Sequence, residues 1–136
     1  MFFTMYCMVL YVPSVFHTYA GSAHPSALLW RADEQKFDML ESQNQIIGFD
    51  RTDRGFFTQN ETVMATGDML ALYTDGIVEV ENAGRKALGI NGLIELVRAQ
   101  MSGTPKVVAD TAMQGVAEFA PSAQRDDVYL IVLGLK

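Results

Sequence analysis

The stretch "MLALYTDGIVEV", residues 69–80, places an Asp-Gly pair between two short apolar runs. Asp-Gly between hydrophobic segments is typical of a tight hairpin turn, because both residues tolerate a positive φ. The same pair also places a carboxylate, Asp75, directly after an apolar strand, where a metal ion could be held. From these residues alone the two interpretations, a hairpin turn and a metal-binding carboxylate, are equally supported.

The composition predicts a compact globular domain. Hydrophobic residues make up 49% of the 136 residues and charged residues 19%, which argues against a disordered chain. We therefore expect a single unit over residues 1–136. The net charge is -6 and no cluster of Lys and Arg occurs, so neither nucleic acid nor a membrane surface is expected as the partner. The single cysteine, Cys7, excludes an intramolecular disulfide and fits a reducing, cytoplasmic compartment.

The N-terminal stretch "MFFTMYCMVLYV", residues 1–12, is almost entirely apolar. It is too short to span a bilayer and lacks the basic segment and cleavage site of a signal peptide. Its Phe, Tyr, Val and Thr content predicts a buried strand with Cys7 in the core. Because a chain rarely begins inside a buried strand, we expect Met1 to lie within a larger domain.

The order of the predicted elements indicates the fold class. Apolar runs bounded by turn residues predict strands at 2–12, 15–20, 27–32, 36–41, 56–65 and 69–74. Two helices follow, one capped by Asn91 and one that opens at Thr104-Pro105. A last strand is predicted at 126–135. Strands followed by helices predict an α+β protein, with antiparallel β-sheet layers flanked by helices.

The position of the acidic residues suggests a metal site. Asp75 follows an apolar strand and Asp126 precedes one, so both carboxylates would be held at strand ends. Mg²⁺ and Mn²⁺ require oxygen ligands of this kind. Gly76 would let a metal-bound water or a substrate approach the backbone. Spacing alone favours the alternative, in which Asp126 and Asp127 belong to a solvated turn.

Other catalytic arrangements are poorly supported by the sequence. It contains no G-x-S-x-G, P-loop or H-E-x-x-H motif. Cys7 lacks the Cys-x5-Arg phosphate loop, and His17 lies in a predicted strand. His24, beside Pro25, is expected to be a local hydrogen-bonding residue. No side chain is therefore predicted to act as a covalent nucleophile.

Four segments together resemble one protein family over essentially the whole chain. They are "YAGSAHPSALLW" (19–30), "IIGF" (46–49), "ATGDMLALYTDGIVEVENAGRKALG" (65–89) and "QRDDVYLIVL" (124–133). In order and spacing they resemble the SpoIIE-type branch of the metal-dependent (PPM-type) protein serine/threonine phosphatases. The most specific phrases are "GD-x-L-x-L-YTDG-x-x-E" and the "RDD" that enters the last strand. The resemblance implies part of a PPM-type α-β-β-α sandwich.

The resemblance also implies the role of each site residue. Asp75 and Asp126 would be ligands of a dinuclear Mn²⁺ or Mg²⁺ centre, with Gly76 and Asp127 in supporting positions. The metals would activate a bridging water that attacks phosphoserine or phosphothreonine. The substrate would be a phosphorylated protein, such as an anti-sigma-factor antagonist, in sigma-factor regulation or two-component signalling.

The chain departs from the family pattern in two ways. Ala23 takes the place of a family glycine before His24-Pro25, which requires a negative φ there. The sequence also lacks the family's Gly-Asp-aromatic-aromatic-Asp and Asp-x-x-Gly-His-Gly motifs, which supply the remaining metal ligands. We therefore expect the C-terminal part of the domain, weakly active or inactive alone, or alternatively a non-catalytic regulatory module. Uncovered strands would make it self-associate, as a dimer or by strand exchange.

Overall fold

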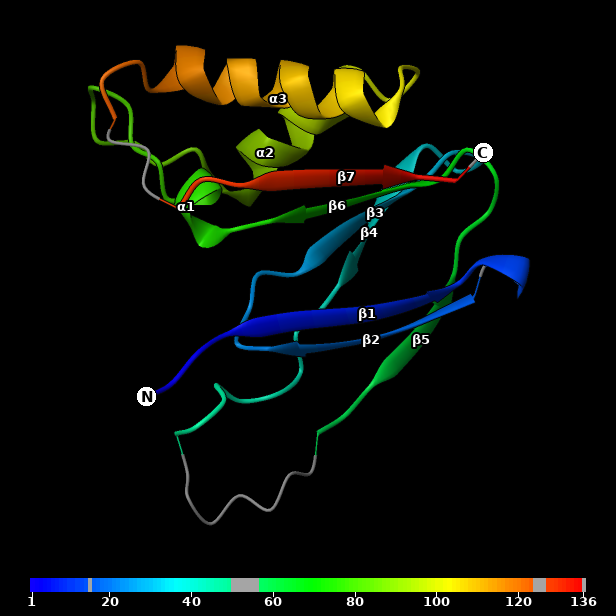
Figure 1. Ribbon diagram of the computed structural model, residues 1–136. Coiled ribbons are helices and arrows are strands. Elements are labelled where there is room, and N and C mark those ends of the chain that lie inside the picture. Colours follow the sequence, from blue (N-terminus) through cyan, green and yellow to red (C-terminus); the bar gives the residue numbers. More distant parts are fainter. Residues whose placement is uncertain (15, 50–56, 124–126, 136) are drawn as a thin grey trace. The chain divides into compact units, whose positions relative to one another are not determined.

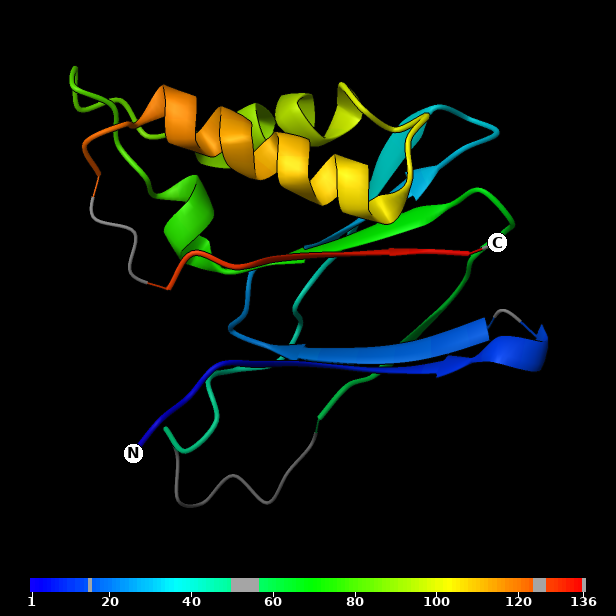
Figure 2. The same ribbon diagram turned by 45° about the horizontal axis from the view of Figure 1, so that its top comes forward.

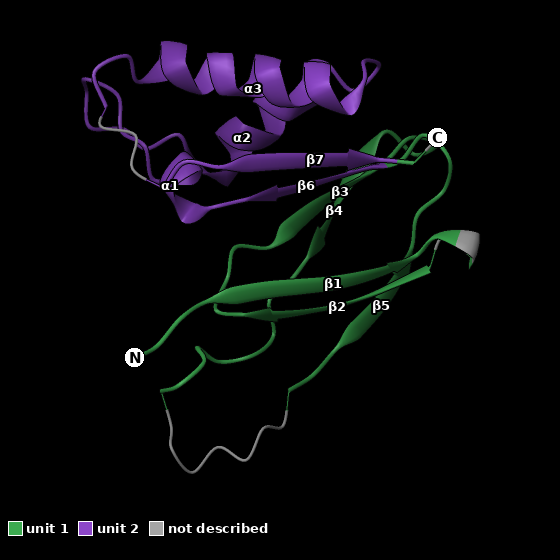
Figure 3. Cartoon of the chain, in the orientation of Figure 1, with its two compact units in different colours: residues 1–68, 135–136 green, residues 69–134 purple. Residues whose placement is uncertain are grey.

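The computed structural model describes residues 1–14, 16–49, 57–123 and 127–135 (Figure 1). The chain divides into two compact units (Figure 3). Unit 1 comprises residues 1–68 and 135–136, and unit 2 comprises residues 69–134. The strands of both units pair antiparallel, and the three α-helices described belong to unit 2. The predicted α+β class with antiparallel sheets is confirmed.

Unit 1 contains a three-stranded sheet with the order β1-β2-β5. Its strands are β1 (Met5–Tyr11), β2 (Phe16–Ser22) and β5 (Asn60–Val63). A short 3₁₀ helix, η1 (Val12–Ser14), connects β1 to β2, which run side by side in Figure 2. The β1–β2 register extends from Met5 opposite Ser22 to Tyr11 opposite Phe16. Both the strands and the turn between them follow the sequence prediction.

Strand β1 differs from its prediction, because it is not buried. Cys7 is exposed, and so are Met5, Val9, Leu10 and Tyr11. An apolar run predicts a strand, but it cannot tell whether one face or both faces are covered. Among the described strands, β1 pairs only with β2. The expectation that Cys7 lies in the core is therefore wrong.

Unit 1 also contains a hairpin formed by β3 (Ala27–Arg31) and β4 (Lys36–Leu40). The residues Ala27 to Trp30 are all buried, which agrees with the continuous apolar run in the sequence. The predicted polar turn between these strands is present, and Gln35 takes a left-handed φ of 51° there. The strand predicted at 56–65 is shorter in the structure, at β5, and part of the prediction lies outside the described residues.

Unit 2 pairs β6 (Met69–Tyr73) with β7 (Leu130–Gly134) and carries the helices α1 (Asp75–Val78), α2 (Gly89–Arg98) and α3 (Pro105–Phe119). Helix α3 packs on both β7 and α2 (Figures 1 and 2). The buried residues of the two longer helices are Leu93, Val97, Val108, Ala112 and Val116. No helix among the described residues is long and apolar enough to cross a membrane.

The helix starts test the capping predictions. The Thr104 side chain accepts a hydrogen bond from Val107 N at the start of α3, and Pro105 is in the first turn, as predicted. The predicted Asn91 cap is wrong, because α2 begins at Gly89. Leu88 N donates to Val80 O (2.9 Å), which fixes the entry to that helix before Asn91 is reached.

Candidate functional site

The Asp-Gly pair of the central motif lies at the start of a helix rather than in a hairpin. After β6 the chain passes through Thr74, which is extended (φ -88°, ψ 155°), and enters the single turn α1 at Asp75. Ile77, fully buried, anchors this turn, and its N–H donates to Thr74 O (3.1 Å). Of the two interpretations that the sequence left open, the hairpin turn is therefore excluded. Asp75 itself is exposed, at the end of a buried strand.

Gly76 holds the Asp75 carboxylate in place. Its N–H donates to Asp75 Oδ1 (3.0 Å), which orients the side chain relative to its own backbone. Because Gly76 lies in α1 and does not have a positive φ, its conformation does not demand glycine.

Thr74 connects the Thr-Asp-Gly motif to Asp127, which lies 53 residues further along the chain. Its backbone N–H donates to Tyr129 O (3.1 Å), and its hydroxyl accepts from Tyr129 N (3.0 Å). The same hydroxyl donates to Asp127 O. Because Thr74 directly precedes Asp75, these bonds hold Asp127 and Tyr129 beside the Thr-Asp-Gly segment. We call this set of three hydrogen bonds the Thr74 clasp.

Asp127 is exposed and has a left-handed backbone, with φ of 55°. Asp and Asn are the non-glycine residues that tolerate this conformation best. The bend also explains why β7 begins at Leu130 and not at the predicted strand start. Asp126, the second predicted ligand, lies outside the described residues, so its position relative to Asp75 stays a prediction.

Asp75 is the predicted metal ligand that lies within the described residues. An exposed, backbone-oriented carboxylate such as Asp75 is the hard oxygen ligand that Mg²⁺ or Mn²⁺ requires, so its chemistry fits. Within the described ranges, however, no group of three or more His, Cys, Asp or Glu side chains could hold an ion. A complete centre would therefore need Asp126 and further ligands in addition to Asp75.

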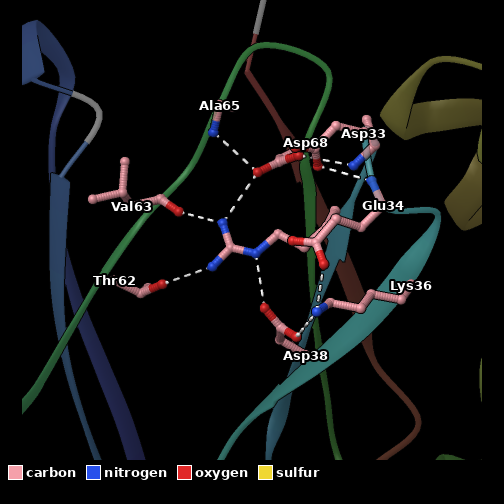
Figure 4. Close-up of polar contacts among 10 residues, drawn as sticks. Asp33, Glu34, Lys36, Asp38, Thr62, Val63, Ala65 and Asp68 are labelled. Carbon is pink, nitrogen blue, oxygen red and sulfur yellow. Dashed lines mark hydrogen bonds and ion pairs between the residues drawn. The ribbon is translucent and has the colours of Figure 1, made fainter.

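Asp68 belongs to the Gly-Asp pair near the start of the segment 65–89 and, unlike Asp75, is buried (Figure 4). It is only 2% exposed, and its carboxylate accepts from Ala32 N (2.9 Å) and Ala65 N (3.0 Å). Arg31 Nη1 lies 3.2 Å from the same carboxylate. These bonds tie β3, the segment after β5 and the approach to β6 together, so Asp68 is a structural anchor. The sequence does not predict this role for Asp68, because Arg31 and Ala32 lie far from it along the chain.

Arg31 extends this anchor across unit 1. Its Nε lies 2.8 Å from Asp38 Oδ2, and its Nη2 donates to Thr62 Oγ1 (3.1 Å). Burial lowers the pKa of Arg31, but the hydrogen bonds to Asp38 and Asp68 outweigh it, so the pKa is raised. The guanidinium therefore stays charged and serves as a permanent cross-link.

His24 is a local hydrogen-bonding residue, as predicted. Its Nδ1 lies 3.0 Å from Pro25 O, and since a carbonyl only accepts, Nδ1 carries the proton. The ring also lies beside Tyr6, with 5.8 Å between the ring centroids. Burial first, and then the coulombic interaction with Tyr19, raise the pKa of Tyr6, so the Tyr6 hydroxyl stays protonated at neutral pH.

Ala23, which precedes that histidine, has a φ of 48°. The expectation of a negative φ is therefore wrong: this alanine adopts the conformation that suits the family's glycine. Its N–H donates to Asn44 O (3.0 Å), and the neighbouring His24 N donates to Ser42 Oγ (3.2 Å). These bonds fix the loop in spite of the unfavourable backbone.

The chain matches one protein family over its whole length. A family model described as Stage II sporulation protein E (SpoIIE) matches residues 1–136. No curated protein sequence matches the chain. Among solved structures, the chain is similar to the SiaA-PP2C domain of Pseudomonas aeruginosa. The TM-score is 0.79 at 17% identity, covering 96% of this chain and 51% of that chain.

Two further structures have the same fold. The phosphatase domain of SpoIIE from Bacillus subtilis, presoaked with Mn, gives a TM-score of 0.68 at 16% identity, covering 98% of this chain and 56% of that chain. The structure of the RsbU and RsbW domains of Rv1364c from Mycobacterium tuberculosis gives a TM-score of 0.76 at 25% identity. The match covers 96% of this chain and 35% of that chain. The chain thus spans about half the length of the two single phosphatase domains.

Proposed function

Since the chain belongs to the SpoIIE family, we propose that it forms the C-terminal part of a metal-dependent protein serine/threonine phosphatase domain. The observation that supports this most directly is the Thr74 clasp. It bonds Asp127 and Tyr129 to Thr74, the residue before Asp75, although they are more than fifty residues away in sequence. The matched phosphatase domains are about twice as long as this chain, so catalysis by such a domain would use residues beyond these 136.

The proposed metal ligands are Asp75 and Asp126, with Mn²⁺ or Mg²⁺ as the ion. Bound ions would activate water and offset charge on the phosphoryl group. The residues of this chain would position the ligands: Gly76 N–H orients the Asp75 carboxylate, and the Thr74 clasp holds Asp127, which follows the second proposed ligand in the sequence. The Bacillus subtilis domain was presoaked with Mn, which supports the choice of ion class.

The proposed substrate is a phosphorylated serine or threonine of a protein, such as an anti-sigma-factor antagonist. A role in sigma-factor regulation or two-component signalling, in the cytoplasm, would suit a chain with a single cysteine and no basic cluster. The matched Mycobacterium tuberculosis structure contains RsbU and RsbW domains together, which supports a protein as the partner.

One observation favours a second function, that of a non-catalytic regulatory module. The residues that the structure describes contain no group of three side chains able to hold a metal. Under this alternative the chain would keep the phosphatase fold and recognise a protein without hydrolysing a phosphate.

Metal binding and hydrolysis separate the two functions. We expect Mn²⁺ to bind the chain weakly in a calorimetric titration, and Asp75→Ala and Asp126→Ala each to abolish that binding. Asp110→Ala is the matched control, because Asp110 is an exposed acid on α3 whose partner is Lys106. Hydrolysis of a phosphoserine peptide with Mn²⁺ is measured on the same four proteins. Mn²⁺ binding that is equal in all four would reject the assigned ligands. Hydrolysis by the wild-type chain and by Asp110→Ala, lost in both ligand variants, would exclude the regulatory module.

A further inference from the structure

The pairing of β6 with β7 continues one residue beyond the end of both strands. The register places Tyr73 opposite Leu130, so the next two residues in line are Thr74 and Tyr129. A hydrogen-bonded antiparallel pair exchanges two backbone hydrogen bonds. The first of these is present, from Thr74 N to Tyr129 O (3.1 Å). The pairing therefore extends to the residue that directly precedes Asp75.

A side chain makes the second hydrogen bond of that pair. The Thr74 carbonyl accepts from Ile77 N (3.1 Å), where the chain turns into α1. The Thr74 hydroxyl accepts from Tyr129 N (3.0 Å), the donor that a backbone carbonyl would receive in a regular pair. Because the hydroxyl takes the place of the carbonyl, the chain leaves the sheet at Thr74 and keeps its pairing with the β7 side. Valine has the same shape as threonine but cannot make this bond.

The same hydroxyl also bonds the residue two positions before Tyr129. It donates to the carbonyl of Asp127, whose backbone is left-handed, with φ of 55°. A hydroxyl has one proton to donate and lone pairs to accept with, so one side-chain atom fixes two points of the segment before β7. The β-branched threonine is restricted at χ1, which limits the conformational freedom lost in making these bonds. Thr74 is therefore a rigid link between Asp75 and that segment.

We propose that Thr74 is a positioning residue for the metal centre, and that closure of the Thr74 clasp and metal binding at Asp75 strengthen each other. The inference rests on the proposed function, because it takes Asp75 as a metal ligand. The second proposed ligand is Asp126, next to Asp127 in the sequence. Ligands from segments this far apart in the chain can share one ion only while those segments are held together. Residues that orient metal ligands typically change metal affinity roughly 10- to 100-fold when they are removed.

The coupling between the clasp and the metal has to be reciprocal. If the closed clasp raises the affinity for the ion, the bound ion raises the fraction of molecules in which the clasp is closed. The first effect is measured as the dissociation constant of the ion. The second is measured as the change that the ion causes in hydrogen exchange of the Tyr129 amide, whose acceptor is the Thr74 hydroxyl. A merely structural role of Thr74 would alter neither quantity.

Calorimetric titration of the whole chain with Mn²⁺ tests the first effect. Thr74→Val should bind Mn²⁺ at least about tenfold more weakly than wild type, and Thr74→Ser, which keeps the hydroxyl, should restore most of the affinity. Asp75→Ala should abolish binding. Thr104→Val is the matched control, because the Thr104 hydroxyl also accepts from a backbone N–H, that of Val107 (3.4 Å), but at the start of α3. Its Mn²⁺ affinity should equal that of wild type.

Hydrogen exchange, resolved to single amides by mass spectrometry, tests the second effect. At a Mn²⁺ concentration ten times the dissociation constant, exchange of the Tyr129 amide should slow by up to roughly tenfold in the wild-type chain. The same addition should leave the Tyr129 amide of Asp75→Ala and the Val107 amide of wild type unchanged. This readout needs no substitution at Thr74, so it decides the question even if Thr74→Val does not fold. Far-UV circular dichroism establishes that each variant is folded.

Four outcomes would overturn the inference and leave Asp75 as a ligand, provided that Asp75→Ala abolishes Mn²⁺ binding. These are a folded Thr74→Val that binds Mn²⁺ as tightly as wild type, a Thr74→Ser that binds as weakly as Thr74→Val, a Thr104→Val that is weakened as much as Thr74→Val, and a Tyr129 amide whose exchange does not respond to Mn²⁺. A wild-type chain that does not bind Mn²⁺, or an Asp75→Ala variant that binds it like wild type, would instead reject the proposed ligand and this inference with it.

Discussion

Ala23 shows how one residue departs from the conformation that its side chain prefers. Its φ of 48° lies in the left-handed region, which costs an alanine roughly 1–2 kcal/mol. The surrounding hydrogen bonds, from Ala23 N to Asn44 O and from His24 N to Ser42 Oγ, maintain the loop against this cost. The loop therefore stores strain that a glycine would release.

We expect Ala23→Gly to stabilise the chain by about 0.5–1 kcal/mol. The gain is the relief of left-handed strain less the extra backbone entropy of glycine in the unfolded chain. Urea unfolding measures the difference. Ala83→Gly is the control, since Ala83 is exposed and does not have a positive φ. Equal effects of the two substitutions would show that Ala23 is not strained.

Thr74 is the residue on which the candidate site depends most. Its hydroxyl donates to Asp127 O and accepts from Tyr129 N, so both hydrogen-bonding functions are used. A threonine at the end of an apolar strand has no special signal in the sequence, and its role was therefore not predicted. The partners lie more than fifty residues away, beyond the reach of any local pattern.

Thr74→Val should cost about 1–2 kcal/mol of unfolding free energy, because the isosteric side chain removes two hydrogen bonds. It should also accelerate hydrogen exchange of the Tyr129 amide, which loses its acceptor. Thr74→Ser keeps the hydroxyl and should preserve the protection of that amide. If the Tyr129 amide exchanges at the same rate in all three proteins, the clasp does not form in solution.

At the scale of elements, Asp68 connects segments of unit 1 that are distant in the sequence. The carboxylate accepts from Ala32 N and Ala65 N and pairs with Arg31, and it thereby connects β3 with the segment between β5 and β6 (Figure 4). These are separate segments in the sequence. Turn residues were expected between the strands at 56–65 and 69–74, but the anchor was not predicted, because Arg31 and Ala32 lie far from Asp68 in the sequence.

Removal of the Asp68 side chain should destabilise the chain by about 3 kcal/mol. Asp68→Ala leaves two backbone N–H groups without their acceptor and removes the more buried of the two carboxylates that pair with Arg31. Asp38→Ala is the comparison, because Asp38 also pairs with Arg31 but its side chain is 38% exposed; its cost should be about 1 kcal/mol or less. Chemical denaturation of both variants tests this order, and a larger loss for Asp38→Ala would contradict it.

At the scale of the whole molecule, buried tyrosines predict how stability depends on alkaline pH. Burial raises the pKa of Tyr73 from 10.0 to about 12. Its folded pKa is therefore higher than its unfolded pKa, and the neutral form is the one that the fold favours. The contribution is fully present below pH 10 and is lost as the pH rises towards 12.

The unfolding free energy should therefore fall by up to about 1.4 kcal/mol per pH unit in that window because of Tyr73. Tyr73→Phe should flatten this part of the profile, since phenylalanine does not titrate. Tyr129→Phe is the control, because Tyr129 is 65% exposed. Urea unfolding at a series of alkaline pH values measures the slopes, and identical slopes for Tyr73→Phe and wild type would contradict the prediction.

The sequence by itself determined the elements and the motifs. Apolar runs and turn residues located the seven strands that the structure describes, and Thr104-Pro105 located the start of α3, because these signals arise from neighbouring residues. The "YTDG" and "RDD" phrases likewise indicated the family that the whole-chain comparison confirms. These signals depend only on residues that are close together in the sequence, so they can be recognised without the structure.

The tertiary structure alone decided which residues meet and which faces stay open. The Asp-Gly pair could be read as a hairpin until β6 was seen to pair with β7 and to enter α1. The exposure of β1, the Asp68 anchor and the Thr74 clasp depend on contacts between distant segments. Such contacts leave no periodic trace in the sequence, because each is specified by the packing of the folded chain and not by the residues on either side of it.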